Sequence, residues 1–181
     1  MDAVQEFRLG DGRNLILRKA VRADAAAIIE NMRQIAGETD FLTFGAGEFN
    51  IPPAREEDLI EQFLQADNRL FLIAEVDGRI VGNIVFSGGS RPRVRHVGEF
   101  GVSLSRDCWG LGIGARMLRY LLDWAKAGGV IRKINLRVRE DNRRAIGLYE
   151  KMGFKREGIR TRDMLVEGRF HGSISMGIEI D

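Results

Sequence analysis

The stretch EFGVSLSRDCWGLGIGA, from Glu99 to Ala115, combines the end of a strand, a glycine-rich turn and the start of a helix. Alternation of Gly110, Gly112 and Gly114 allows the turn to expose successive backbone N–H groups at the N-terminus of the helix, where the helix dipole is positive. Such a corner binds phosphate oxygens without needing a charged side chain. The stretch therefore predicts a ligand that carries phosphate.

The turn alone leaves the identity of that ligand open. GLGIGA formally fits the dinucleotide fingerprint G-x-G-x-x-G/A, but that fingerprint should directly follow a buried strand and open a long doubly wound domain. Here the polar run 105–108 intervenes, and too little chain follows. A Walker loop is excluded because no Gly-Lys-Ser/Thr follows the glycines. A nicotinamide-dependent enzyme and a glycine-rich loop without a ligand remain as alternatives.

Hydrophobic periodicity around the turn predicts an α+β fold. We expect strands over residues 14–20, 70–76, 79–86, 94–104, 133–139, 154–165 and 170–180. Helices should follow Asp24, as a capping residue, and Pro53, and two more should begin near Gly114 and Asn142. This order indicates a mixed, largely antiparallel sheet. With no repeat or linker in the sequence, we expect one domain over 1–181, with its core at about 14–180.

The composition is that of an ordinary globular chain, with 181 residues, 44% of them hydrophobic and 30% charged. Cys108 is the only cysteine, which excludes an internal disulfide framework and favours a reducing compartment. The first residues are polar and no stretch is long enough to span a bilayer, so we expect a cytoplasmic protein without a membrane partner. His96 and His171 are too few and too far apart in sequence for a metal site.

The charge is unevenly distributed. Residues 1–90 carry nine Lys and Arg against fifteen Asp and Glu, whereas residues 91–170 carry nineteen against nine. An acidic first half and a basic second half suggest two faces for unlike partners, although solvated surface is an equal alternative. The basic residues are spread over strand and helix positions rather than gathered in one run, so nucleic acid is not expected as a partner.

Two blocks of this sequence resemble the GNAT family of N-acetyltransferases. Trp109 to Gly114, WGLGIG, resembles the family's acetyl-CoA pyrophosphate loop, Arg/Gln-x-x-Gly-x-Gly/Ala, with Trp at the first position as in relatives similar to the ribosomal-protein and polyamine acetylating branches. Asn142 to Phe154, NRRAIGLYEKMGF, is similar to the family signature N-x-x-A-x-x-L-Y-x-x-x-G-F. The two blocks lie in the expected order with a strand between them.

The resemblance implies a three-layer α/β/α sandwich whose sheet is splayed at the cofactor site. It implies acetyl-CoA as co-substrate and no metal. Backbone N–H groups of Val102 and Leu104 would bond the thioester and the pantetheine arm, and Asn142 would cap its helix and contact the cofactor. The pyrophosphate would be bound by Trp109, Gly110, Leu111, Gly112, Ile113, Gly114 and Ala115. Similar proteins are often dimers, so a homodimer is among the expected partners.

Glu99 is the candidate general base. It shares one face of its strand with Gly101 and Ser103, two small residues that leave room for a ligand. A primary alkylamine has a pKa of about 10.4 and arrives protonated, so a carboxylate, acting directly or through water, is needed to neutralise it. The alternative is a simple ion pair of Glu99 with Arg95 or Arg137.

Tyr149 is the candidate general acid, because it matches the tyrosine that in the family protonates the leaving thiolate. A tyrosine on an apolar helical stripe is otherwise a core residue, which is the alternative. Cys108 has no histidine base beside it in the sequence, so direct attack of the amine in a ternary complex is preferred to an acyl-enzyme.

The acceptor is expected to lie against the irregular segment 38–44, with Glu38 and Phe41 as its binding residues. A small amine or a protein N-terminus fits this interpretation, and polyamines, aminoglycosides and amino acids all remain open. Gly172 departs from similar proteins, which often carry an acidic residue there. A non-catalytic sensor or assembly module that binds coenzyme A is the alternative function.

Overall fold

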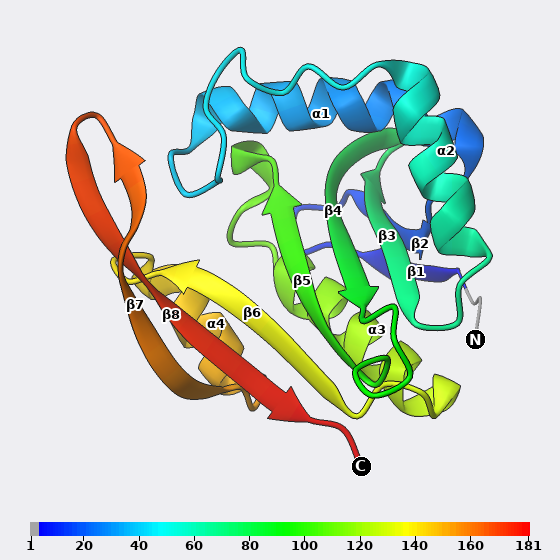
Figure 1. Cartoon of the computed structure of the whole chain (residues 1–181). Coiled ribbons are helices and arrows are strands. Elements are labelled where there is room, and N and C mark those ends of the chain that lie inside the picture. The colour runs from blue at the N-terminus through cyan, green and yellow to red at the C-terminus, as the bar shows by residue number, and fades with distance from the viewer. Residues whose placement is uncertain (1–3) are drawn as a thin grey trace.

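The structure, a computed structural model, describes residues 4–181. Within that span, eight strands form one sheet in the order β1-β2-β3-β4-β5-β6-β8-β7, and all neighbours are antiparallel except β5 and β6. The strands are β1 (Gln5–Arg8), β2 (Asn14–Lys19), β3 (Arg69–Val76), β4 (Arg79–Gly88), β5 (Val97–Leu104), β6 (Lys133–Arg139), β7 (Lys155–Val166) and β8 (Arg169–Glu179). The predicted mixed, largely antiparallel sheet is confirmed (Figure 1).

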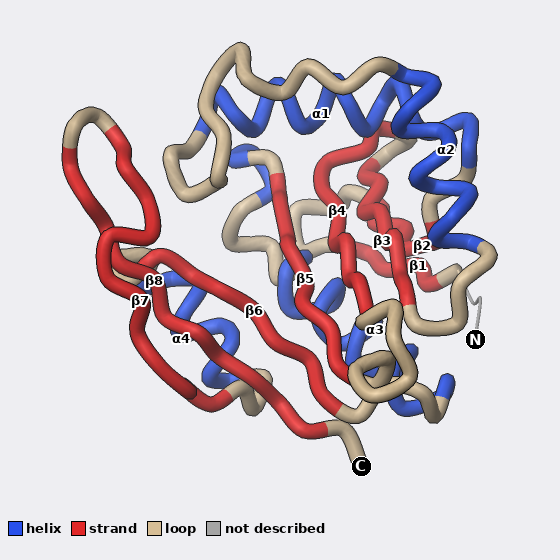
Figure 2. The backbone as a smooth tube through the Cα atoms, viewed as in Figure 1, coloured by secondary structure: helices blue, strands red, loops and turns tan. Residues whose placement is uncertain are grey.

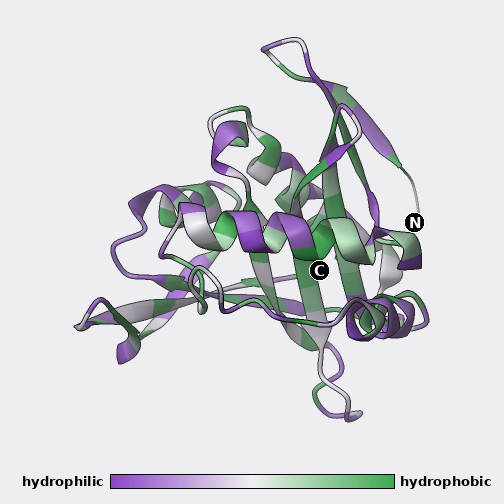
Figure 3. Cartoon of the chain, turned by 90° about the horizontal axis from the view of Figure 1, so that it is seen from above, coloured by the Kyte–Doolittle hydropathy of each residue, from purple (hydrophilic) through white to green (hydrophobic). Residues whose placement is uncertain are grey.

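Helices cover both faces of the sheet, which confirms the three-layer arrangement (Figures 1 and 2). They are α1 (Ala25–Glu38) and α2 (Pro53–Leu64) on one face, and α3 (Ile113–Gly128) and α4 (Arg143–Lys151) on the other. Each pair closes its own apolar core, because the two faces of β3 belong to different clusters: Ile73 packs with α1 and α2, and Leu72 packs with α3. The helices in Figure 3 carry both hydrophobic and hydrophilic turns, as expected of elements with one buried side.

Strands β5 and β6 separate part of the way along their length, and we call the opening between them the splay. These two parallel strands pair only from Val97 with Lys133 to Glu99 with Asn135, and beyond that point they diverge (Figure 1). The antiparallel pairing of β5 with β4 continues to Leu104. The second half of β5 is therefore left with one open edge, as predicted.

Three local expectations were wrong. Strand β1 was missed, because it has only four residues and none of them is buried. Strand β5 begins at Val97 rather than Val94, since the N–H of Val97 closes a turn onto the Val94 carbonyl at 3.1 Å. The carboxylate of Asp24 does not cap α1, because it accepts hydrogen bonds from the Arg18 guanidinium and the Val21 N–H.

The predicted hairpin turn Asp77-Gly78 is confirmed, with φ of 47° and 81°. In the described span, 4–181, no helix combines the length and apolar character needed to cross a membrane.

Candidate active site

The glycine turn leads directly into α3. Gly110 and Gly112 have φ of 83° and 76°, a left-handed conformation that glycine adopts without strain. Gly112 is the N-cap residue, and the first helical bond runs from the Arg116 N–H to the Gly112 carbonyl, at 3.2 Å. The N–H groups of residues 113–115 therefore have no acceptor within the helix. Together with the turn before them, they form a positively polarised site that suits an anion, which we call the anion corner (residues 109–115).

Trp109 anchors this turn to the end of β5. Its indole Nε1 donates to the Leu104 carbonyl at 2.8 Å. The guanidinium groups of Arg106 and Arg144 lie 5.6 and 4.9 Å from the centre of its ring. Trp109 thus has two cationic side chains over its ring, next to the turn, and one of them, Arg144, comes from α4.

The second motif block packs against the first. Asn142 caps α4 as predicted, since its Oδ1 accepts from the Ala145 N–H at 3.2 Å. A Cβ added at Gly114 would lie 3.3 Å from Cδ2 of Leu148, so glycine allows α3 and α4 to approach closely there. The two motif blocks are therefore in direct contact. A contact between Asn142 and a cofactor stays a prediction.

The open edge of β5 presents backbone donors. The N–H of Ser105 donates to the Val81 carbonyl and that of Gly89 to the Val97 carbonyl, at 2.8 and 3.0 Å, so the odd-numbered residues of β5 form the hydrogen-bonded pairs with β4. The backbone groups of Val102 and Leu104 therefore point the other way, into the space that β6 leaves. Their geometry suits the role predicted for them.

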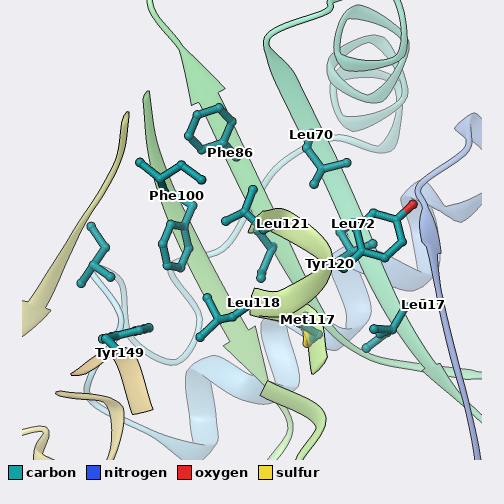
Figure 4. Close-up of a cluster of buried hydrophobic side chains, with 14 of the residues drawn as sticks. Leu17, Leu70, Leu72, Phe86, Phe100, Met117, Leu118, Tyr120, Leu121 and Tyr149 are labelled. Atoms are coloured by element: carbon teal, nitrogen blue, oxygen red, sulfur yellow. The ribbon is translucent and has the colours of Figure 1, made fainter. Parts of the chain in front are cut away.

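Tyr149 lies on the side of the sheet that α3 and α4 cover. The residue is 6% exposed, and its ring packs against those of Phe100 and Phe154, with both ring centres 6.0 Å away. Figure 4 shows Tyr149 and Phe100 in this buried cluster. Burial raises the pKa of Tyr149 to about 12. The hydroxyl therefore keeps its proton throughout the neutral range, as a proton donor must.

Glu99 lies on the opposite face, at the point where β5 and β6 separate. Its Oε1 accepts from Nε of Arg137 at 3.0 Å, so the ion pair that was the alternative interpretation is present. Both side chains are close to half exposed, at 49% and 44%. Gly101, the next residue on this face, has open space where a side chain would begin. The carboxylate is thus accessible from the side of the sheet that carries α1.

The two predicted acceptor residues are positioned by structural contacts. Glu38 ends α1, and its Oε2 accepts from the N–H of Arg106 at 2.7 Å. Phe41 packs under the guanidinium of Arg139, which lies 4.3 Å from its ring centre. An open pocket of about 400 Å³ lies beside them, lined by residues 36–40, 45, 46 and 106. A direct role of either residue in binding an acceptor remains a prediction.

Arg139 is a residue that the sequence analysis missed. Its side chain is 4% exposed, and it donates to the Asp40 carbonyl at 2.8 Å and to the Asp141 carboxylate at 2.7 Å. The hydrogen bond from Arg139 lowers the pKa of Asp141. Arg139 thereby ties the loop after α1 to the end of β6. Strand alternation could have revealed it, because Ile134, Leu136 and Val138 point to the opposite face.

The departure at Gly172 also has a structural reason. The Gly172 N–H donates to Oε1 of Glu140 at 2.8 Å, and a Cβ at this position would lie 2.9 Å from Oε2 of the same carboxylate. Glu140 thus fills the space where a side chain of residue 172 would stand. In the described part of the chain, no group of three or more His, Cys, Asp or Glu residues could hold a metal ion.

Comparison with known proteins gives concordant matches. The sequence profile of the "Acetyltransferase (GNAT) family" matches residues 30–154. An L-amino acid N-acetyltransferase of Escherichia coli is 30% identical over 99 residues, which are 55% of this chain and 61% of that protein. An N-alpha-acetyltransferase of Mycobacterium tuberculosis is 38% identical over 107 residues, 58% of this chain and 64% of that protein. The chain thus spans less than two thirds of the length of these relatives.

Solved structures match over more of the chain. An acetyltransferase of the GNAT family from Streptococcus pneumoniae is 30% identical with a TM-score of 0.90, over 92% of this chain and 99% of that one. A putative acetyltransferase from Salmonella typhimurium, solved with its cofactor acetyl-CoA, has a TM-score of 0.80 over 92% and 94% of the two chains. At 21% identity, the second match shows a shared fold alone.

Proposed function

This chain belongs to the acetyltransferase (GNAT) family, and from that premise we propose that it transfers the acetyl group of acetyl-CoA to a primary amine by direct attack in a ternary complex. The observation that carries the proposal is the splay between β5 and β6, where the backbone edge of Val102 and Leu104 leads to the anion corner at 109–115. A thioester arm and its diphosphate need such an edge and such a corner side by side.

The residues at this corner fit a diphosphate. The first turn of α3 has no acidic residue, and its free N–H groups need no side chain to bind phosphate oxygens. Arg106 and Arg144, whose guanidinium groups lie over the Trp109 ring, add positive charge that a diphosphate would neutralise. Trp109, Gly110, Leu111, Gly112, Ile113, Gly114 and Ala115 are thus the proposed cofactor contacts, together with Asn142.

The chemistry requires three contributions from the chain. Acetyl-CoA supplies the acetyl group as a thioester, and its carbon–sulfur bond breaks as the new carbon–nitrogen bond forms. The N–H of Val102 would stabilise negative charge on the carbonyl oxygen, as an oxyanion hole does. Glu99 would take the proton of the incoming ammonium, and Tyr149 would return a proton to the departing sulfur. Glu99 and Tyr149 approach from opposite faces, which keeps the two protons apart.

The acceptor side supports a cationic substrate. Glu99 is accessible beside Gly101, and Glu38 lines the pocket at the end of α1, with Phe41 next in the chain to its lining residue Asp40. The named relatives act on L-amino acids in one case and on protein N-termini in another, so a small amine or a protein N-terminus is the proposed acceptor. We place the enzyme in the cytoplasm on the ground of its single buried cysteine, and a homodimer is the proposed assembly.

The test is thiol release from acetyl-CoA across polyamines, aminoglycosides, amino acids and short peptides. We expect at least one class to be acetylated, and the variant Tyr149→Phe to lower the rate by about 100-fold while the affinity for acetyl-CoA stays close to that of the wild type. Tyr120→Phe, which changes the second buried tyrosine, on the buried side of α3, is the matched control (Figure 4). Binding of acetyl-CoA without thiol release in any class would identify a binding module and refute the proposal.

A further inference from the structure

Glu99 and Arg137 form an exposed pair of opposite charges on the open face of the splay. They extend from neighbouring strands: Glu99 lies at the last position where β5 still pairs with β6, and Arg137 lies two residues further along β6, where the strands have separated. The even-numbered residues of β6 point to the opposite, buried face, so the Arg137 guanidinium lies on the same side as the proposed base. An acceptor that reaches Glu99 must therefore also meet Arg137.

A ligand can replace the contact between Glu99 and Arg137 with little loss of stability. An ion pair exposed to this degree contributes about 0–1 kcal/mol to stability. Arg137 uses Nε for Glu99, and its Nη1 lies 3.9 Å from Asp163, whose carboxylate already accepts from the Ser173 hydroxyl. A guanidinium has five N–H donors in a fork that matches a carboxylate. Donors of Arg137 thus remain for a second anion.

The surroundings leave room for that anion. Ser175 lies opposite Arg137 on β8, and Gly158 lies opposite Ser175 on β7. On the other side of the pair, Gly101 leaves open space above β5. No large side chain at these positions covers the pair, and the other nearby arginine, Arg139, is already engaged by Asp40 and Asp141.

We propose that the acceptor is a free α-amino acid, with Glu99 holding its ammonium group and Arg137 binding its carboxylate. This inference rests on the proposed function. An amino acid carries its two charges on one carbon, as close together as the two side chains are, so four charges of alternating sign would form. A polyamine has only cations and would be repelled by Arg137, and the N-terminal residue of a peptide has no α-carboxylate to offer.

The experiment compares each L-amino acid with its α-carboxamide and its decarboxylated amine, by thiol release from acetyl-CoA. We expect kcat/KM to be about 10- to 100-fold higher for the preferred amino acid than for the two analogues that lack its carboxylate, the range of one charge-assisted interaction. Arg137→Gln should reduce this ratio toward one by raising KM for the amino acid. Arg137→Lys, which keeps the charge without the fork, should give an intermediate ratio.

Arg95→Gln is the matched control, since Arg95 is a similarly exposed arginine paired with Asp67 beyond the other end of β5. Its ratio should equal that of the wild type. Turnover of peptides or polyamines with no preference for an α-carboxylate would overturn this inference and leave the proposed function intact, as would a ratio unchanged in both Arg137 variants. Absence of thiol release from every acceptor, with acetyl-CoA bound, would refute the proposed function and this inference with it.

Discussion

The proposed cofactor site and the proposed acceptor site, on the two sides of the splay, use different chemical groups. The proposed cofactor side consists of backbone N–H groups from one continuous stretch, from Val102 to Ala115, which α4 supports from the next block of sequence. The proposed acceptor side consists of charged side chains from separate parts of the chain: the loop after α1, strand β5 and strand β6. A site made of backbone tolerates many side chains, whereas a site made of side chains changes its ligand with single substitutions. The cofactor side therefore suits a constant ligand and the acceptor side a variable one.

Among the substitutions on the acceptor side, we expect Glu99→Gln to lower catalysis the most. It removes the proposed base and keeps its size, so we expect kcat to fall by about 10² to 10⁴-fold, the usual contribution of a general base. Affinity for acetyl-CoA should not change, because Glu99 lies on the opposite face from Tyr149. Calorimetry with acetyl-CoA and steady-state kinetics separate the two effects. Glu157→Gln, another carboxylate paired with a cation, Lys133, is the control and should leave both unchanged.

We expect Gly112→Asp to weaken the binding of acetyl-CoA on the cofactor side. Aspartate tolerates the left-handed conformation better than most residues and is a good N-cap, so α3 should persist. Its carboxylate, however, would occupy the N–H groups of the anion corner and repel a diphosphate. We expect acetyl-CoA to bind about 100-fold more weakly, a difference of about 2.7 kcal/mol, measured by calorimetry.

The control for that variant is Gly78→Asp, in the β3–β4 turn, where φ is also positive, at 81°. It imposes a similar backbone cost far from the turn at 109–114, so only thermal stability should fall. Equal affinity of wild type and Gly112→Asp for acetyl-CoA would contradict the backbone site. Loss of affinity in Gly78→Asp as well would indicate a general effect of strain.

The contrast between local backbone features and contacts of distant side chains also explains what could be predicted from the sequence. Gly110, Gly112 and Asn142 act through local chain conformation, so their residue types and spacing were sufficient. The sheet and its splay followed from strand order and motif. The role of Arg139 depends on contact with Asp40, 99 positions earlier in the chain, which no local pattern encodes.

Three single positions also depend on contacts with distant segments, which local sequence patterns do not reveal. The ion pair of Glu99 was foreseen only as one of two alternatives, because strand parity gives a side chain's face but not its partner. Gly172 differs from the family pattern for a reason that lies in Glu140, on another segment. For Trp109, the motif showed the departure, but only the fold showed that its indole bonds the Leu104 carbonyl.

The pH dependence of stability tests whether Tyr149 is shielded from water on the cofactor side. In the unfolded chain this hydroxyl loses its proton near its ordinary value of 10.0, whereas burial raises its pKa to about 12 in the folded chain. Between those values the folded state binds more protons, so the free energy of unfolding falls as pH rises. The loss from this group by pH 12 should be about 2 kcal/mol. It should be absent in Tyr149→Phe, and parallel urea-unfolding profiles of the two proteins would contradict the burial.

Arg139→Met should have the smallest effect, and it separates positioning from chemistry on the acceptor side. Methionine fills a similar space but cannot donate to Asp40 or Asp141, so the loop over residues 39–52 loses its attachment to β6. Since hydrogen bonds from a charged group contribute about 1.5–3 kcal/mol, we expect faster hydrogen exchange in that loop and a KM for the acceptor raised about 10-fold. Arg156→Met, which breaks an exposed pair with Glu150, is the control. A lower kcat with an unchanged KM would instead mean that Arg139 takes part in the chemical step, and the acceptor side would then extend beyond Glu99 and Arg137.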